Sequence, residues 1–168
     1  LCDGNVTNIV EVAGAFVAGM TCPQEGTYTN TWTVTDACGN ISEVYTQVIS
    51  ITDNTAPVWT TMAGALNATL ECSDAAGIAL AQAALPVASD LCDVDVTNIV
   101  EVAGNFVPGM TCPQEGTFTN TWTVTDACGN ISEVYTQVIT ITDNTAPTWT
   151  TLAGALDATL ECSDAAGI

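Results

Sequence analysis

The sequence repeats itself with a period of ninety residues, and this feature constrains its fold more than any other. Thr21–Gly26 returns as Thr111–Gly116, and Asp53–Pro57 returns as Asp143–Pro147. Of the 78 pairs of positions that this offset allows, nine differ, and all nine changes are mild. Near-identical tandem units are typical of an array that provides length or multivalency rather than a single active site. The period is domain-sized, since solenoid repeats have about 20–50 residues.

The charge composition narrows the class of protein. The chain contains no Lys, Arg or His, and its 19 Asp and Glu residues give a net charge of −19. Because 48% of the residues are hydrophobic, the chain is not a disordered acidic tail and is expected to fold. No carboxylate has a salt-bridge partner, so salt or bound metal must screen the charge. Nucleic acid and anionic membrane are excluded as direct partners, because both need Lys or Arg to neutralise phosphate.

The eight cysteines fall four per period at irregular spacings. No Cys-x-x-Cys pair and no histidine occurs, so a zinc site is disfavoured and a disulfide framework is favoured. An even number of cysteines per unit indicates an oxidising compartment, and we therefore expect an extracellular or cell-surface location. The sequence starts and stops in mid-period, without a signal peptide or a transmembrane run, as expected for a window of a longer secreted polypeptide.

Alternating residues predict short strands in the one full period. Trp122 and Val124 alternate with threonines, which indicates one buried face and a threonine ladder on the other. A later strand has apolar residues of one parity, namely Tyr135, Ile139 and Ile141. An earlier strand carries valines of one parity, namely Val94, Val96, Val100 and Val102. The alanine-rich stretch Ala75–Leu85 leaves two alternatives open, one or two helical turns or a strand flanked by loops.

This pattern predicts an all-β fold of tandem, disulfide-bonded domains. About ninety residues of alternating strands and turn signals fit an immunoglobulin-like β-sandwich. We therefore expect residues 1–56 to be the C-terminal part of one domain, residues 57–146 a complete domain, and residues 147–168 the N-terminal part of the next. Trp59 and Trp149 follow the linker prolines and are candidates for contacts at the joint between domains.

Three motifs carry a family resemblance: Trp122–Asn130, Ile139–Pro147 and Leu160–Cys162. They resemble the hyalin-repeat (HYR-like) immunoglobulin-type domains of giant secreted surface proteins of Bacteroidetes-type bacteria, a group that includes gliding-motility adhesins. The resemblance covers the whole chain. It implies tandem domains outside the cell or at its surface.

The resemblance also implies strand directions and, from them, disulfides. Each unit then has one end at the linker that contains Asp53 and the other at Asp143. Cysteines at the same end are expected to pair, although four cysteines allow three connectivities and the others stay open. The expected bridges are Cys72–Cys112, Cys92–Cys128 and, by translation, Cys2–Cys38.

The same strand directions bring acidic loops to the linker. Hard oxygen ligands from two loops and a linker predict a Ca²⁺ site that stiffens the joint. Its expected ligands are Asp53, Asn54, Asp90, Asp93, Asp95 and Asp126. The alternative is that Asp126 and Asp90 cap turns by accepting hydrogen bonds from backbone N–H groups, and that Asp93 and Asp95 are solvated surface charges. Asn5 replaces Asp95 in the other copy, which weakens the metal hypothesis.

The function predicted from these features is structural and adhesive. Without histidine no Ser–His–Asp or Cys–His site can form, and no enzyme is expected. The chain is expected to form the shaft of a long cell-surface or secreted filament for surface adhesion or gliding motility. Its partners would be neighbouring repeats of the same chain and a surface polysaccharide or substratum. The alternatives are a self-assembling extracellular fibre subunit joined by strand complementation and a carbohydrate-binding module array of a secreted enzyme.

Overall fold

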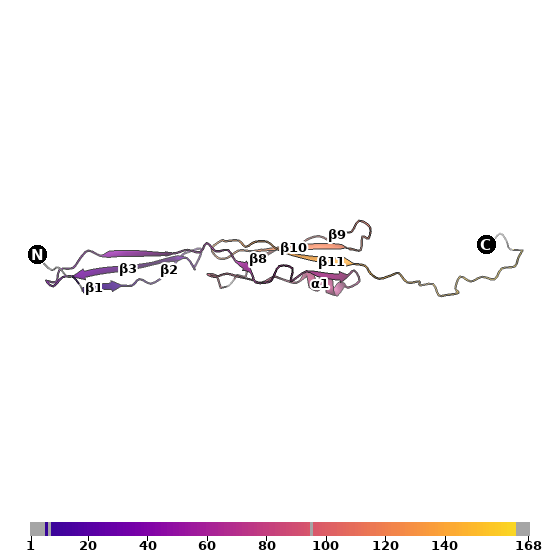
Figure 1. Ribbon diagram of the computed structural model, residues 1–168, viewed down its shortest axis with the longest axis horizontal. Helices are drawn as coiled ribbons and strands as arrows, with labels where there is room; N and C mark the ends of the chain where they lie inside the picture. The colour runs from indigo at the N-terminus through magenta and orange to yellow at the C-terminus, as the bar shows by residue number, and fades with distance from the viewer. Residues whose placement is uncertain (1–5, 7, 95, 164–168) are drawn as a thin grey trace.

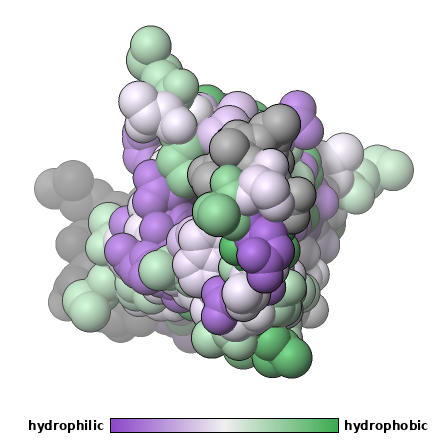
Figure 2. Space-filling model, turned by 90° about the vertical axis from the view of Figure 1, so that its right-hand side faces the viewer, coloured by the Kyte–Doolittle hydropathy of each residue, from purple (hydrophilic) through white to green (hydrophobic). Residues whose placement is uncertain are grey.

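The computed structural model describes residues 6, 8–94 and 96–163 and shows an elongated, β-rich molecule (Figure 1). Two sheets follow one another along the long axis, and a short helix lies beside the second (Figure 1). Viewed end-on, the right-hand end of the molecule carries hydrophilic and hydrophobic residues interspersed (Figure 2). We call residues 1–56 the first segment, residues 57–146 the central unit and residues 147–168 the third segment. Among the described residues, no helix has the length and apolar character needed to cross a bilayer.

The first segment forms a four-stranded antiparallel sheet centred on one long strand. Its strands are β1 (Asn8–Val12), β2 (Val17–Ala18), β3 (Gly26–Thr35) and β4 (Tyr45–Ile51). The central strand β3 pairs with β4 along one edge and with β1 and β2 along the other.

The central unit keeps this arrangement and extends it. Its main sheet contains β6 (Ala68–Glu71), β8 (Ile99–Val102), β9 (Val107–Pro108), β10 (Gly116–Val124) and β11 (Tyr135–Thr142). Trp122 of β10 lies opposite Tyr135 of β11, in the register that also places Trp32 opposite Tyr45 in the first segment. The added strand β6 pairs in parallel with β11.

A smaller second layer packs near the sheet of the central unit. It consists of the ribbon β5 (Val58–Trp59) with β7 (Ala88–Ser89) and the helix α1 (Ala75–Gln82). Asp74 caps the helix, because its Oδ1 accepts a hydrogen bond from Gly77 N at 2.9 Å. The alanine-rich stretch is therefore helical. The β-rich fold fits the immunoglobulin-like class, but its second layer is a ribbon and a helix rather than a second full sheet.

The core of the central unit has the parity expected from the sequence. The buried apolar side chains of its two long strands are Trp122, Val124, Tyr135, Ile139 and Ile141, none more than 4% exposed. The valines of β8 lie on the outer face instead, and Val102 is 65% exposed. The register explains the difference, because Val100 and Val102 lie opposite Thr123 and Thr121 of the threonine ladder.

Two buried amides lie within this core face. Asn120 is 3% exposed and Gln137 is fully buried, and Asn120 Nδ2 donates to Gln137 Oε1 at 3.0 Å. Gln137 Nε2 donates to the carbonyl oxygens of Leu66 at 2.7 Å and Ala81 at 3.0 Å. The bond to Ala81 ties the main sheet to helix α1 of the second layer, because a buried amide must find partners within the protein.

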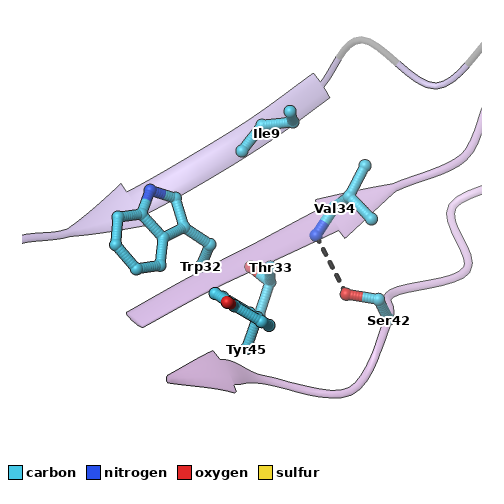
Figure 3. Close-up of a pocket in the computed structure, with 6 residues that line it drawn as sticks. All are labelled: Ile9, Trp32, Thr33, Val34, Ser42 and Tyr45. Atoms are coloured by element: carbon cyan, nitrogen blue, oxygen red, sulfur yellow. Dashed lines mark hydrogen bonds between the residues drawn. The ribbon is translucent and has the colours of Figure 1, made fainter. Parts of the chain in front are cut away.

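In the first segment the corresponding face is open. Tyr45 is 70% exposed, whereas its counterpart Tyr135 is 4% exposed. An apolar pocket of about 350 Å³ includes Trp32 and Tyr45 (Figure 3). In the central unit Trp59 covers this position, with its ring centroid 5.6 Å from that of Tyr135 and its Nε1 donating to Glu133 O at 2.7 Å. Trp59 thus packs inside its own unit rather than across the joint.

Candidate functional site at the joint between segments

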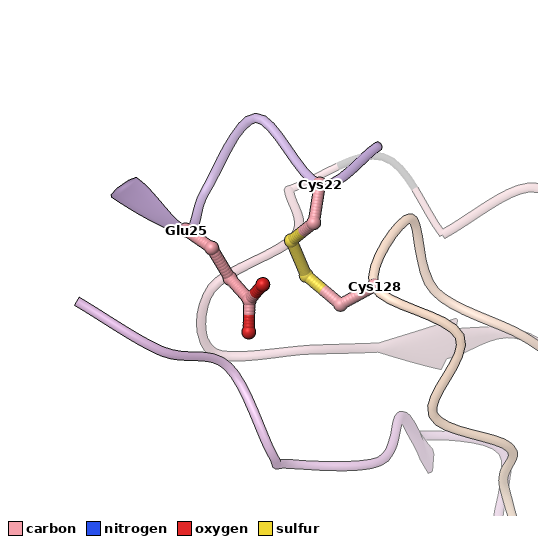
Figure 4. Close-up of side chains that lie close together, drawn as sticks. All are labelled: Cys22, Glu25 and Cys128. Carbon is pink, nitrogen blue, oxygen red and sulfur yellow. A yellow bond between two sulfur atoms is a disulfide. The ribbon is translucent and has the colours of Figure 1, made fainter. Parts of the chain in front are cut away.

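One disulfide joins the first segment to the central unit. It links Cys22, in the loop before β3, to Cys128, in the turn after β10, across 106 residues of sequence (Figure 4). The two Cα atoms are 4.7 Å apart, within the range that disulfides tolerate. Glu25 lies beside the bridge, with a carboxylate oxygen within 4.8 Å of both sulfur atoms (Figure 4). The joint is therefore covalent in addition to the peptide linker.

Local turns bring both cysteines to the joint. Glu25 N donates to Cys22 O at 3.2 Å, and Glu25 Oε1 accepts a hydrogen bond from Asp53 N at 3.1 Å. The Cys22 loop is thus attached to the linker. Cys128 lies in a turn that Gly129 closes with a φ of 94°, a conformation that favours glycine.

The bridge corrects the expected connectivity. Because Cys128 is bonded to Cys22, the predicted Cys92–Cys128 bridge is wrong. The predicted partners Cys72 and Cys112 are both free thiols. The prediction assumed that each unit closes on itself, whereas the Cys22 loop reaches into the following unit.

The third predicted bridge is not formed by the described residues, because Cys38 is a free thiol and Cys2 lies outside them. The predicted ends do agree with the structure. Cys92 and Cys128 lie at the joint near Asp53, and Cys72 lies near Asp143.

Polar contacts also cross the joint. Gln24 Nε2 of the first segment donates to Asp93 Oδ1 at 3.3 Å, and Asn130 Nδ2 of the central unit donates to Asp53 O at 3.1 Å. Asp53 is only 4% exposed as a result, whereas its counterpart Asp143 is half-buried. The joint is a packed interface rather than a free hinge.

Asp126 caps a turn, as the alternative to metal binding proposes. Its Oδ1 accepts hydrogen bonds from Cys128 N at 2.9 Å and Asn130 N at 2.8 Å, and its Oδ2 accepts one from Asn130 Nδ2 at 2.8 Å. Burial raises the pKa of Asp126, but the hydrogen bonds from Asn130, Cys128 and Gly129 outweigh burial and lower its pKa overall. Both carboxylate oxygens are therefore occupied.

Asp93 positions the same turn against the first segment. Its Oδ2 accepts a hydrogen bond from Ala127 N at 3.0 Å, and its Oδ1 accepts the one from Gln24. The side chain is 7% exposed. It therefore connects the Cys128 turn with the Cys22 loop.

Asp53, Asp90 and Cys92 form a cluster at the joint whose ligand atoms lie within 4.8 Å of one another. Asp53 Oδ1 accepts a hydrogen bond from Thr55 N at 3.1 Å, and Asp90 Oδ1 accepts one from Cys92 N at 2.8 Å. Oδ2 of each aspartate is buried and has no hydrogen-bond partner. Burial, and then the charges of Asp53 and Asp90, raise the pKa of the Cys92 thiol. Two buried carboxylate oxygens are thus available to a cation.

The other predicted ligands do not join this cluster. Asn54 is exposed, and its amide donates to Thr52 Oγ1 at 3.4 Å. Asp95 lies outside the described residues. Of the six predicted ligands, Asp53 and Asp90 are the two that fit an oxygen site for a hard cation.

A related cluster lies at the opposite end of the central unit. The ligand atoms of Glu71, Cys72 and Asp143 lie within 4.8 Å of one another. Burial, and then the charges of Asp143 and Glu71, raise the pKa of the Cys72 thiol, and Cys112 is near enough to contribute. Glu71 Oε1 accepts a hydrogen bond from Asn144 Nδ2 at 2.7 Å.

Sequence reasoning missed the role of the Cys22 loop. Gln24 and Glu25 are ordinary polar residues in a loop, and nothing in their spacing indicates contacts with the following unit. A usable signal was Cys22 itself, because the expected pairings left it without a partner in this sequence.

Comparison with known proteins adds a family match. Residues 60–141 match the model of the HYR-like domain with 4 cysteines. The match supports a HYR-type repeat in this segment, and HYR-like domains are extracellular domains of the adhesion type. The matched segment contains four cysteines, namely Cys72, Cys92, Cys112 and Cys128. No curated protein and no solved structure matched the chain.

Proposed function

We propose that the chain is part of the structural and adhesive shaft of a long cell-surface or secreted filament, built from tandem immunoglobulin-like units of ninety residues. The observation that carries this proposal is the Cys22–Cys128 disulfide between consecutive segments. A bond of this kind holds neighbouring units in a fixed order and orientation. The elongated shape and the match to an adhesion-type domain support the same function (Figure 1).

The two alternative functions have less support. A carbohydrate-binding array needs an exposed aromatic platform, whereas Trp122 is 1% and Tyr135 4% exposed in the central unit. A fibre joined by strand complementation needs the open face of the first segment to be filled by another copy. In the central unit, residues of the same unit cover the corresponding face, so no second copy is needed there. The proposal assigns no catalytic group to the chain.

The proposal predicts that length and adhesion increase with the number of units. Variants that carry the central unit once, twice or three times should lengthen by about 40–55 Å per added unit, the span of about 12–16 extended residues. Small-angle X-ray scattering measures the length. Beads coated with each variant, held on a polysaccharide surface under flow, should be retained by degrees because weak contacts add through multivalency.

A point substitution tests whether adhesion depends on a single side chain. Asp126→Ala removes a turn cap in the central unit and should leave bead retention within about two-fold, because a shaft has no group on which activity depends. Loss of all retention in a variant that stays folded and keeps its length would contradict the structural function. Equal lengths for one, two and three units would contradict the array itself.

We also propose that Ca²⁺ binds at the joint through Asp53 and Asp90. Their unpartnered Oδ2 atoms offer two hard ligands, and water would complete the coordination. With few protein ligands, the dissociation constant is expected at about 10⁻⁴–10⁻³ M, as in extracellular modules. The net charge of −19, with no Lys, Arg or His, favours any cation at this position.

Removal of one ligand tests the calcium proposal. At 10 mM Ca²⁺ the chain should gain about 1–3 kcal/mol in the free energy of unfolding, measured by thermal melting against NaCl of equal ionic strength. Asp53→Asn should abolish the gain. Asp143→Asn, at the corresponding position of the other end, should keep it. An equal response of Asp53→Asn and the unchanged chain would show general charge screening and no site.

A further inference from the structure

We propose that a second disulfide crosses each joint of the array, between Cys92 of one unit and the residue of the preceding unit that corresponds to Cys72. The inference rests on the proposed array and adds a second covalent bond to every joint. In the described structure the two thiols are free and lie at different ends of the central unit. Cys92 lies at the joint near Asp53, and Cys72 lies at the opposite end near Asp143.

The two ends of the central unit supply complementary halves of one site. Cys92 Sγ lies within 4.8 Å of a carboxylate oxygen of Asp53. Cys72 Sγ lies within 4.8 Å of a carboxylate oxygen of Asp143, which is the same linker aspartate one period later. One thiol belongs to the unit that ends at the aspartate, and the other belongs to the unit that follows it. Where both units are complete, the two thiols flank a single carboxylate.

The backbone at both aspartates has the same local geometry, which justifies the translation by one period. The backbone N of Asp53 donates to Glu25 at 3.1 Å, and that of Asp143 donates to Glu115 at 3.2 Å. Oδ1 of each aspartate accepts a hydrogen bond from the threonine two residues later, at 3.1 Å and 3.2 Å. The two linkers therefore begin from the same conformation.

Repetition of the Cys22–Cys128 bridge at every joint would exclude the competing pairing of Cys72 with Cys112 within a unit. Cys22 corresponds to Cys112 one period later. If the pattern of the observed joint repeats, Cys112 is bonded to the following unit and cannot bond to Cys72. Cys72 and Cys92 are then the two remaining cysteines of each unit, one at each end. With the second bridge, the two bridges of each joint together use all four cysteine positions of the unit.

The chemistry is an ordinary oxidation of two thiols. Cys72 and Cys92 together lose two protons and two electrons and form one S–S bond. A protein or small-molecule disulfide of the oxidising compartment accepts the electrons through a mixed disulfide and leaves as two thiols. The bond needs Cα atoms about 4.4–6.8 Å apart, the geometry that the first bridge already meets at this joint.

A chain with the central unit present twice tests the proposal, because it contains one complete joint. Within the two copies, Cys92→Ser in the first and Cys72→Ser in the second leave one cysteine of each kind, both at the internal joint. Alkylation of these two thiols in the native state should fall at least ten-fold relative to the unduplicated chain. Cleavage before aspartate under non-reducing conditions should recover Cys72 with Cys92 by mass spectrometry.

The opposite arrangement is the matched control. Cys72→Ser in the first copy and Cys92→Ser in the second leave the same two cysteines at the outer ends, where both should stay alkylated. Undiminished alkylation at the internal joint, or recovery of Cys72 with Cys112, would overturn the second bridge. Scattering on the same samples separates this failure from failure of the array, because an array must lengthen on duplication whether or not the bridge forms.

Discussion

Replacing Cys22 with serine is expected to lower the free energy of unfolding by about 4–5 kcal/mol. The Cys22–Cys128 bridge spans 106 residues, and a crosslink over about 100 residues removes roughly that much chain entropy from the unfolded state. Guanidinium denaturation followed by tryptophan fluorescence, without reductant, measures the loss. Adding reductant to the unchanged chain should reproduce most of it.

Cys112→Ser is the matched control for this substitution. Cys112 lies in the same loop sequence one period later but is a free thiol, so its replacement should change the free energy of unfolding by less than about 0.5 kcal/mol. Equal losses for the two variants, or none for Cys22→Ser, would contradict a stabilising bridge between the segments.

Gln137→Ala is expected to cost about 3–5 kcal/mol, although glutamine is a residue usually found at the surface. Its fully buried side chain accepts a hydrogen bond from Asn120 and donates to the carbonyl oxygens of Leu66 and Ala81. Alanine would leave a cavity, and the Asn120 amide and the Leu66 carbonyl would lose their hydrogen bonds to Gln137, whereas Ala81 O would keep the one from Ala84 N. Chemical denaturation measures the cost.

The repeat provides the control for this variant as well. Gln47 is the counterpart of Gln137 on the open face of the first segment, where it is exposed and accepts a hydrogen bond from Asn30 at 3.2 Å. Gln47→Ala should cost less than about 1 kcal/mol. A similar loss of unfolding free energy at both positions would mean that contacts with the second layer add little to the stabilisation by Gln137.

Strand parity was predictable because it depends on local alternation. The burial of Trp122 and Tyr135 follows from residues two apart along each strand. The same rule could not place Val100 and Val102, because a shared parity does not say which face of the sheet it belongs to. Cross-strand register decides this, and register places both valines on the threonine side.

The buried amides and the bridge were not predictable for a different reason. Asn120 and Gln137 interrupt the apolar parity of their strands, and single polar residues there indicate outward-facing positions unless their partners are known. Asn120 bonds to Gln137 on the neighbouring strand, and Gln137 also bonds to carbonyl oxygens more than fifty positions away. Cys22 likewise finds its partner in another unit, and a pattern within one period contains no information on contacts between periods.

The candidate cation site was predictable only in part. Strand direction brought Asp53 and Asp90 to one end, where the structure clusters them with Cys92. The sequence alone could not show which carboxylate oxygen atoms accept hydrogen bonds from backbone N–H groups. Asp126 and Asp93 accept hydrogen bonds from backbone N–H groups of the same turn. Asp53 and Asp90, in contrast, each have an Oδ2 atom without a hydrogen-bond partner.

The bridge between consecutive segments determines how a filament of such units would respond to pulling. Tension entering at one bridge leaves through the next, and the shortest covalent path between them in the central unit runs along β10, from Cys128 back to Cys112. The sixteen residue-to-residue steps of this path reach at most about 55 Å and are already largely extended, whereas ninety unfolded residues would reach about 300 Å. A filament linked in this way would break a covalent bond before it lengthened appreciably, and would transmit force with almost no extension.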